Sequence, residues 1–226
     1  MKDVAESIAA LGYHGLALTL RGHNRAAEDK HSGRLELWLE DLMCAWKRCS
    51  AEYPDLPIYL VGFSLGGLLS GLFVDRFPEV KVDKLVLLAP AFAPIRAIAL
   101  VYPLFPLRFL GFSLPALLPQ EFRAYNSTSL WNYSALLRGV RAFKKVPPSS
   151  FSKIPVLVIM SDKDELVSAV RTKRVCEKFG PTWKYLAVNP QAQGCRPYDH
   201  LLIDSKRVGS AEWQRIVGEI KQFLQN

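Results

Sequence analysis

The sequence predicts an α/β fold in which a mostly parallel sheet is flanked by helices. Three expected strands, at 58–61, 84–89 and 156–160, are continuous apolar runs in which polar and apolar residues do not alternate. Such runs indicate burial on both faces, as in a parallel sheet that helices cover on each side. Segments with helical periodicity separate the runs, and a length of 226 residues suits a single domain, residues 1–226.

The other elements follow from apolar spacing and from the Gly and Pro residues that interrupt it. The strongest helix is 34–52, where Leu35, Leu39, Leu42 and Trp46 form one apolar stripe. Further helices are expected at 3–11, from 65 to about 77, at 167–179 and at 210–224, and further strands at 15–20 and 183–188.

Residues 91–150 break this alternation and are expected to form a lid inserted in the domain. Arg108 is the only charged residue between 97 and 119. Prolines 103, 106 and 115 would repeatedly interrupt a membrane-spanning helix, so an apolar lid over a pocket is favoured over a span. The lid's large apolar side chains suit an acyl chain, or they serve only to pack the lid on the sheet. They are Ile98, Leu100, Val101, Leu104, Phe105, Leu107, Phe109, Leu110 and Phe112.

Composition excludes several classes of protein. Half of the residues are hydrophobic and 22% are charged, which excludes global disorder. The net charge of +8 favours contact with anionic surfaces, and peripheral membrane contact is one hypothesis. The basic residues are scattered, so no nucleic-acid partner is expected. Cysteines 44, 49, 176 and 195 lack metal-finger spacing and are expected to be free thiols. The acidic N-terminus shows no secretory signal, so a cytoplasmic location is expected.

The pattern G-x-S-x-G occurs at Gly62–Gly66, between an expected strand and an expected helix. In that context it predicts a sharp turn that holds the Ser64 hydroxyl above the sheet as a nucleophile. Glycines on either side of the turn are expected to remove side chains that would collide. The next backbone N–H, that of Leu65, would donate to a developing oxyanion. The alternative is a strand–helix turn whose glycines serve packing alone.

A nucleophilic serine needs a base and an orienting acid, in the chain order serine, acid, histidine for this turn. His14, His23 and His31 precede Ser64, which leaves His200, unless His200 is a surface histidine. The acid is expected just after the strand at 156–160, where Asp164 is preferred and Asp162 is the alternative. Both aspartates would otherwise cap the next helix. Asp199 and Asp204 are expected to be solvated.

These residues resemble the α/β-hydrolase superfamily, particularly its serine esterase, monoacylglycerol-lipase-like and serine-aminopeptidase-like branch. The matching segments are the serine turn at 62–67, the acid turn at 161–164, the histidine loop at His200, and 18–25, which is similar to the family's D-x-R-G-H-G-x-S loop. Two departures are Asn24 and Ser161, where the family usually has glycine. The resemblance implies the catalytic set Ser64, His200 and Asp164 with Leu65 at the oxyanion, and it requires no metal or organic cofactor.

A larger departure lies at the N-terminus. The family has three strands and an H-G loop before the segment that resembles 15–20, and this chain begins with a helix instead. One missing strand would lie between 15–20 and 58–61, which leaves a gap of about 10 Å. Either those strands close up or their edges stay unpaired. We expect an N-terminally truncated hydrolase, favouring a fragment of a longer enzyme over a shortened homologue. The H-G loop supplies an oxyanion donor, and losing one typically costs about 10²–10³ in rate.

The resemblance implies a serine hydrolase that cleaves carboxylic esters, with lipid or monoacylglycerol esters favoured by the apolar lid. A serine at the turn argues against haloalkane-dehalogenase chemistry, which uses a carboxylate there. The alternative is a non-catalytic or weakly active hydrolase remnant that binds a lipid or a protein partner.

Overall fold

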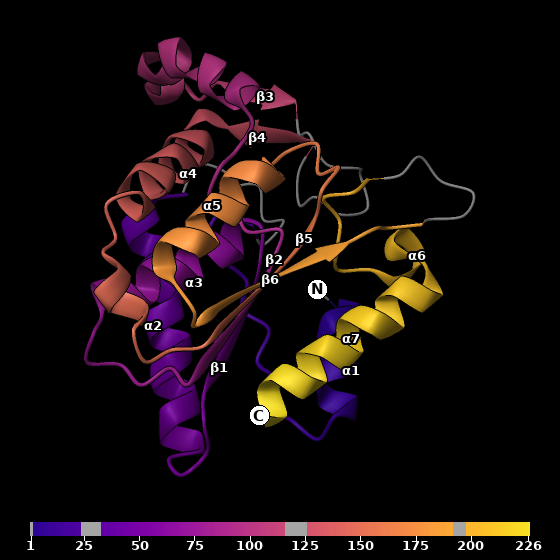
Figure 1. The fold of residues 1–226 in the computed structure, drawn as a ribbon. Coiled ribbons are helices and arrows are strands. Elements are labelled where there is room, and N and C mark those ends of the chain that lie inside the picture. The colour runs from indigo at the N-terminus through magenta and orange to yellow at the C-terminus, as the bar shows by residue number, and fades with distance from the viewer. Residues whose placement is uncertain (1, 24–32, 116–125, 192–197) are drawn as a thin grey trace.

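Four parallel strands form the central sheet in the order β1-β2-β5-β6 (Figure 1). The computed structural model describes residues 2–23, 33–115, 126–191 and 198–226. In chain order its elements are α1 (Lys2–Ala10), α2 (Leu35–Glu52), β1 (Tyr59–Phe63), α3 (Leu65–Arg76), β2 (Lys84–Leu88), the 3-10 segment η2 (Arg96–Leu110), β3 (Ser113–Pro115), β4 (Ser127–Ser129), α4 (Leu130–Phe143), the 3-10 turn η4 (Pro148–Phe151), β5 (Val156–Ser161), α5 (Ala169–Phe179), β6 (Trp183–Val188), α6 (Ser205–Val208) and α7 (Ser210–Gln225).

The sheet is buried on both faces, as the continuous apolar strands predict. In β2, Leu85 and Leu87 face one core cluster while Val86 and Leu88 face the other. Helices α2, α3, α4 and α5 cover the first face, and α1 and α7 cover the second (Figure 1). The predicted α/β class, a parallel sheet flanked by helices, is confirmed.

The first helix packs against the last. Val4 of α1 is buried in the cluster that contains Ile216 and Ile220 of α7. The N–H and the hydroxyl of Ser205 both donate to Asp3 Oδ2, each at 3.2 Å. These contacts join positions that are 202 residues apart in the sequence.

The prediction of a strand at 15–20 is wrong, because those residues form no strand. Leu16 and Leu18 are 46% and 41% exposed, which excludes a strand buried on both faces. The segment instead links α1, on one face of the sheet, to α2 on the other, and β1 is the terminal strand of the four described. In the described sheet, residues 15–20 therefore do not pair with residues 58–61. A strand needs a neighbouring strand for its backbone hydrogen bonds, and none of the strands in the described part of the chain pairs with 15–20.

The predicted lid, residues 91–150, divides into two parts. Its last part, α4 with η4, packs in the main core, where Phe143 stacks on Phe92 with ring centroids 4.1 Å apart. The exposed part is η2 and β3, which form the top of the molecule in Figure 1. Residues 116–125 lie outside the described part of the chain. Among the described residues, no helix is long and apolar enough to cross a membrane.

A short stalk, residues 93–95, ties the start of η2 to the loop before α5. Pro94 bridges Val167 in antiparallel fashion, the Ile95 N–H donates to Leu166 O at 2.9 Å, and the Ser168 N–H donates to Ala93 O at 2.9 Å. The same loop contains Asp164. The exposed apolar segment is thus attached directly to the loop of the predicted acid.

Three of the cysteines, Cys44, Cys49 and Cys176, are free thiols, as expected. Cys195 lies outside the described residues.

Candidate active site

Ser64 occupies the tight turn between β1 and α3, in a strained backbone conformation. Its φ of 49° and ψ of −111° lie in a backbone region that residues other than glycine rarely adopt. Two backbone hydrogen bonds to the segment after β2 hold this geometry: the Ser64 N–H donates to Leu88 O and the Ala91 N–H donates to Ser64 O, both at 2.9 Å. Strain of this kind costs about 1–3 kcal/mol and persists only where neighbouring structure holds it.

The glycines around the turn differ in what they allow. A Cβ on Gly62 would lie 2.6 Å from the backbone carbon of Gly66, and one on Gly67 would lie 2.8 Å from Pro90 Cβ. A Cβ on Gly66 would meet no heavy atom within 4 Å. The expectation that glycines prevent collisions therefore holds for Gly62 and is wrong for Gly66. The close approach on the helix side belongs to Gly67, one residue beyond the motif.

His200 lies between the serine and an aspartate. Its Nε2 is 2.9 Å from Ser64 Oγ, and its Nδ1 is 2.8 Å from Asp164 Oδ2. An ionised carboxylate only accepts hydrogen bonds, so this pairing selects the tautomer in which Nδ1–H donates to Asp164 and Nε2 accepts from the serine hydroxyl. The structure thus brings Ser64, His200 and Asp164 together from three distant parts of the chain.

The histidine and the aspartate are shielded from water, with exposed side-chain fractions of 1% and 0%. The Phe63 ring lies beside the imidazole, with centroids 5.1 Å apart. The second carboxylate oxygen of Asp164, Oδ1, accepts from the N–H groups of Leu166 and Val167 at 2.9 and 2.8 Å. These bonds fix the carboxylate and compensate the burial of its charge.

Leu65, whose N–H is the expected oxyanion donor, directly follows Ser64 and begins α3. The hydrogen-bond ladder of this helix starts with the Leu68 N–H, which donates to Ser64 O at 3.2 Å. The N–H groups that precede the ladder of a helix lack an intrahelical acceptor and carry partial positive charge. A negative oxygen beside Ser64 would meet this end of the helix.

The other candidate acids lie elsewhere. Asp162, the alternative to Asp164, accepts from the Tyr185 hydroxyl at 3.2 Å. Asp204 caps α6 by accepting from the Lys206 N–H at 2.8 Å. Asp199 differs from the expected solvated group, because it is half-buried and burial raises its pKa.

The remaining histidines contact aromatic rings. His14 stacks on Tyr53 with centroids 4.7 Å apart, and the His23 ring lies 5.8 Å from that of Trp38. His31 lies outside the described residues.

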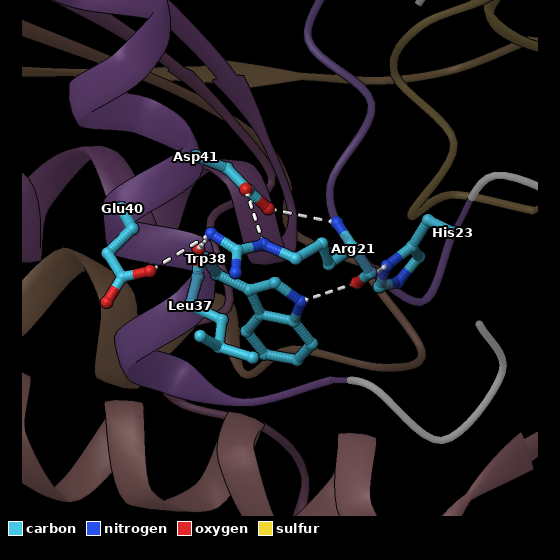
Figure 2. A network of polar contacts seen from close by, with 6 residues as sticks. All are labelled: Arg21, His23, Leu37, Trp38, Glu40 and Asp41. Atoms are coloured by element: carbon cyan, nitrogen blue, oxygen red, sulfur yellow. Dashed lines mark hydrogen bonds and ion pairs between the residues drawn. The ribbon is translucent and has the colours of Figure 1, made fainter.

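Residues 21–23, the R-G-H part of the matching segment 18–25, are hydrogen-bonded to the first turns of α2 (Figure 2). The backbone N–H and the Nε of Arg21 both donate to the Asp41 carboxylate, at 3.0 and 2.7 Å. A terminal guanidinium nitrogen reaches Glu40 and Leu37 O, each at 3.1 Å, and the Trp38 indole N–H donates back to Arg21 O at 2.8 Å. This network anchors the loop. Asn24 and Arg25, the rest of the matching segment, lie outside the described residues.

A parallel sheet between two helical layers, with a serine on the strand–helix turn and a histidine and an aspartate beside it, defines an α/β-hydrolase. Comparison with known sequences agrees. The family described as serine aminopeptidase, S33, matches residues 1–193, and the chain belongs to this family of hydrolases.

Several relatives are named for the hydrolysis of lipid esters. The chain is 24% identical over 205 residues to a monoacylglycerol lipase of Mycolicibacterium smegmatis, in a match that covers 83% of this chain and 73% of that protein. It is 31% identical over 96 residues to lysophospholipase L2 of Escherichia coli, which covers 40% of this chain and 28% of the relative. This second match spans well under half of either protein.

Solved structures show the same fold. A monoacylglycerol lipase from Paleococcus ferrophilus superposes with a TM-score of 0.71 at 17% identity, covering 96% of this chain and 88% of that one. A monoglyceride lipase variant from Saccharomyces cerevisiae, in complex with a substrate analog, gives a TM-score of 0.73 at 13% identity, covering 99% of this chain and 80% of that one.

Proposed function

We propose that this chain is a serine hydrolase that cleaves carboxylic esters of lipids, monoacylglycerols among them. The observation that carries the proposal is the continuous hydrogen-bonded path from Ser64 Oγ through the His200 ring to Asp164. The names of the relatives, a monoacylglycerol lipase and a lysophospholipase, support the substrate class.

In the proposed reaction, Ser64 Oγ attacks the ester carbonyl carbon while its proton moves to His200 Nε2. Asp164 holds the Nδ1–H and stabilises the imidazolium that forms. The carbonyl oxygen, now negative, accepts from the Leu65 N–H at the start of α3. When the intermediate collapses, the alcohol leaves with the proton from Nε2. Water, activated by the same nitrogen, then attacks the acyl-enzyme and releases the acid.

The proposal is tested by active-site labelling together with turnover of a long-chain monoacylglycerol. We expect a fluorophosphonate probe to modify Ser64, and both labelling and hydrolysis to be lost in Ser64→Ala and His200→Ala. Ser70→Ala is a matched control, because the Ser70 hydroxyl donates within α3 to Gly66 O at 2.8 Å. Esterase activity retained in Ser64→Ala would refute the mechanism. A folded wild-type chain that is never labelled would instead support the alternative, a non-catalytic hydrolase remnant.

We further propose that the exposed apolar surface of η2 and the residues after it contacts anionic membranes. Leu100, Phe109 and Leu110 are 77%, 70% and 71% exposed, and Phe112 adds to the same surface. The segment 96–115 contains two arginines and no acidic residue. Apolar insertion combined with cationic attraction is the combination that favours an anionic lipid surface.

Co-sedimentation with vesicles tests this contact. Vesicles that contain phosphatidylserine are expected to bind the protein more strongly than pure phosphatidylcholine, with less binding at high salt. Leu110→Ser should weaken binding, whereas Leu56→Ser, at an exposed leucine outside η2, should leave it unchanged. Equal binding by the two variants would contradict the proposal.

A further inference from the structure

Glu165, the residue that follows Asp164, reaches the other end of the same histidine. Its Oε2 accepts the backbone N–H of His200 at 3.2 Å, while Asp164 Oδ2 holds the ring at Nδ1. Two consecutive acidic residues therefore accept hydrogen bonds from His200, Glu165 from its main chain and Asp164 from its side chain. Sequence reasoning passed over Glu165, because a glutamate beside an acid turn looks like an ordinary surface residue.

The histidine loop provides little other support for this N–H. The two residues after His200 bond within the loop itself, with the Leu201 N–H donating to Tyr198 O and the Leu202 N–H to His200 O, each at 3.0 Å. Only the N–H of His200 among these three crosses to another element, the loop after β5. The contact therefore ties the loop of the proposed base to the loop of the proposed acid.

Glu165 is an exposed residue, and its contact with the His200 N–H is partly buried. Partial burial raises the pKa of the Glu165 carboxyl and the charge of the neighbouring Asp164 raises it further, while hydrogen bonds from its own backbone N–H and from the His200 N–H lower it.

We propose that Glu165 is a positioning residue for the proposed base: its carboxylate holds the His200 backbone, so that Nε2 stays within hydrogen-bond reach of Ser64 Oγ. The inference rests on the proposed function, in which His200 takes the serine proton. It assigns Glu165 no contact with substrate. A misplaced base slows the chemical step and leaves ground-state binding of the ester unchanged.

Two substitutions separate this role from a general structural one. Glu165→Ala removes the acceptor, and Glu165→Gln keeps an oxygen at the same place without the charge. We expect Glu165→Ala to lower kcat about 3- to 15-fold with KM unchanged, the range for one lost hydrogen bond, and Glu165→Gln to restore kcat to within about 2-fold. Asp162→Ala is the matched control, an acid on the same loop that contacts Tyr185 rather than His200, and it should stay within about 2-fold of wild type.

A second measurement does not depend on activity. The His200 amide hydrogen should exchange slowly in the wild-type protein and in Glu165→Gln, and at least about 10-fold faster in Glu165→Ala. Wild-type kcat in Glu165→Ala, a change confined to KM, absence of rescue by Glu165→Gln, or unchanged exchange would each overturn the inference. Failure of the proposed function is distinct from these, since the wild-type protein would then not be labelled at Ser64 while the exchange measurement still reports on the contact.

Discussion

The two neighbouring glycines at the start of α3 give a sharp test of how the serine turn is held. Alanine at position 67 would place its Cβ 2.8 Å from Pro90 Cβ and 3.1 Å from Pro90 Cα. Carbon atoms pack at about 3.5–4.0 Å, so the overlap is about 0.7–1.2 Å. Pro90 lies between Leu88 and Ala91, whose backbone groups hold Ser64 from both sides. Its displacement would therefore be transmitted to the serine.

The expected magnitude follows from comparing positions 66 and 67. Both glycines lie in the first turn of α3, so alanine should gain about 0.5–1 kcal/mol of helix stability at either. Position 67 also carries a crowding cost of about 1–3 kcal/mol, whereas a Cβ at position 66 meets nothing within 4 Å. The propensity gain cancels in the comparison. Gly67→Ala should thus be about 1–3 kcal/mol less stable than Gly66→Ala.

Urea unfolding of both variants measures this difference directly. In thermal unfolding it corresponds to about 2–4 °C for each kcal/mol in a protein of this size. The fluorophosphonate labelling rate provides a second readout, because a nucleophile misplaced by about 1 Å can lose about 100-fold in rate. If the two variants unfold at the same urea concentration, or if Gly67→Ala is the more stable, the account of the turn is wrong.

Two further predictions concern α5. Burial raises the pKa of the Cys176 thiol to about 12, so this thiol stays neutral at pH 8. Iodoacetamide should therefore modify the exposed Cys44 but not Cys176 until the protein is unfolded, as peptide mass spectrometry would show. Modification of both cysteines at equal rates in the folded protein would contradict this prediction. Arg171 donates to the Ala93 and Pro94 carbonyls of the stalk, so Arg171→Met should lower the free energy of unfolding by about 1–3 kcal/mol. Lys173 is an exposed residue on the same helix, and Lys173→Met should change that free energy by less than about 0.5 kcal/mol. Equal stability of these two variants would refute the role of Arg171.

Local sequence signals predicted the sheet because its strands are largely apolar runs with Gly or Pro residues near their ends. The strand at 183–188 has the bounds expected, and β5 extends one residue beyond the expected end at Met160. The segment 15–20 has a similar composition and forms no strand. The difference lies in the neighbours: β5 is paired on both sides, whereas none of the described strands pairs with 15–20, and composition does not reveal what lies beside a segment.

The candidate site was predictable where motif spacing fixes geometry. The G-x-S-x-G pattern and the order of serine, acid and histidine identify the three side chains that the structure brings together. The preference for Asp164 over Asp162 has a reason that is visible in the fold: Asp164 Oδ1 caps its own loop, which turns Oδ2 toward the imidazole. Glu165 carries no such signal, because its contact depends on where a loop 35 residues later returns.

The packing of α1 against the C-terminal helices, through Asp3 with Ser205 of α6 and through Val4 with α7, has a consequence for synthesis of the protein on the ribosome. Asp3 and Ser205 are 202 residues apart, and translation at about 5–20 residues per second separates their appearance by about 10–40 s. During that interval the apolar side of α1, with Val4 at its centre, has no helix to cover it. A nascent chain stalled before residue 205 would expose that surface to chaperones, and a nonsense mutation that removed only α7 would leave the apolar side of α1 without the helix that covers it.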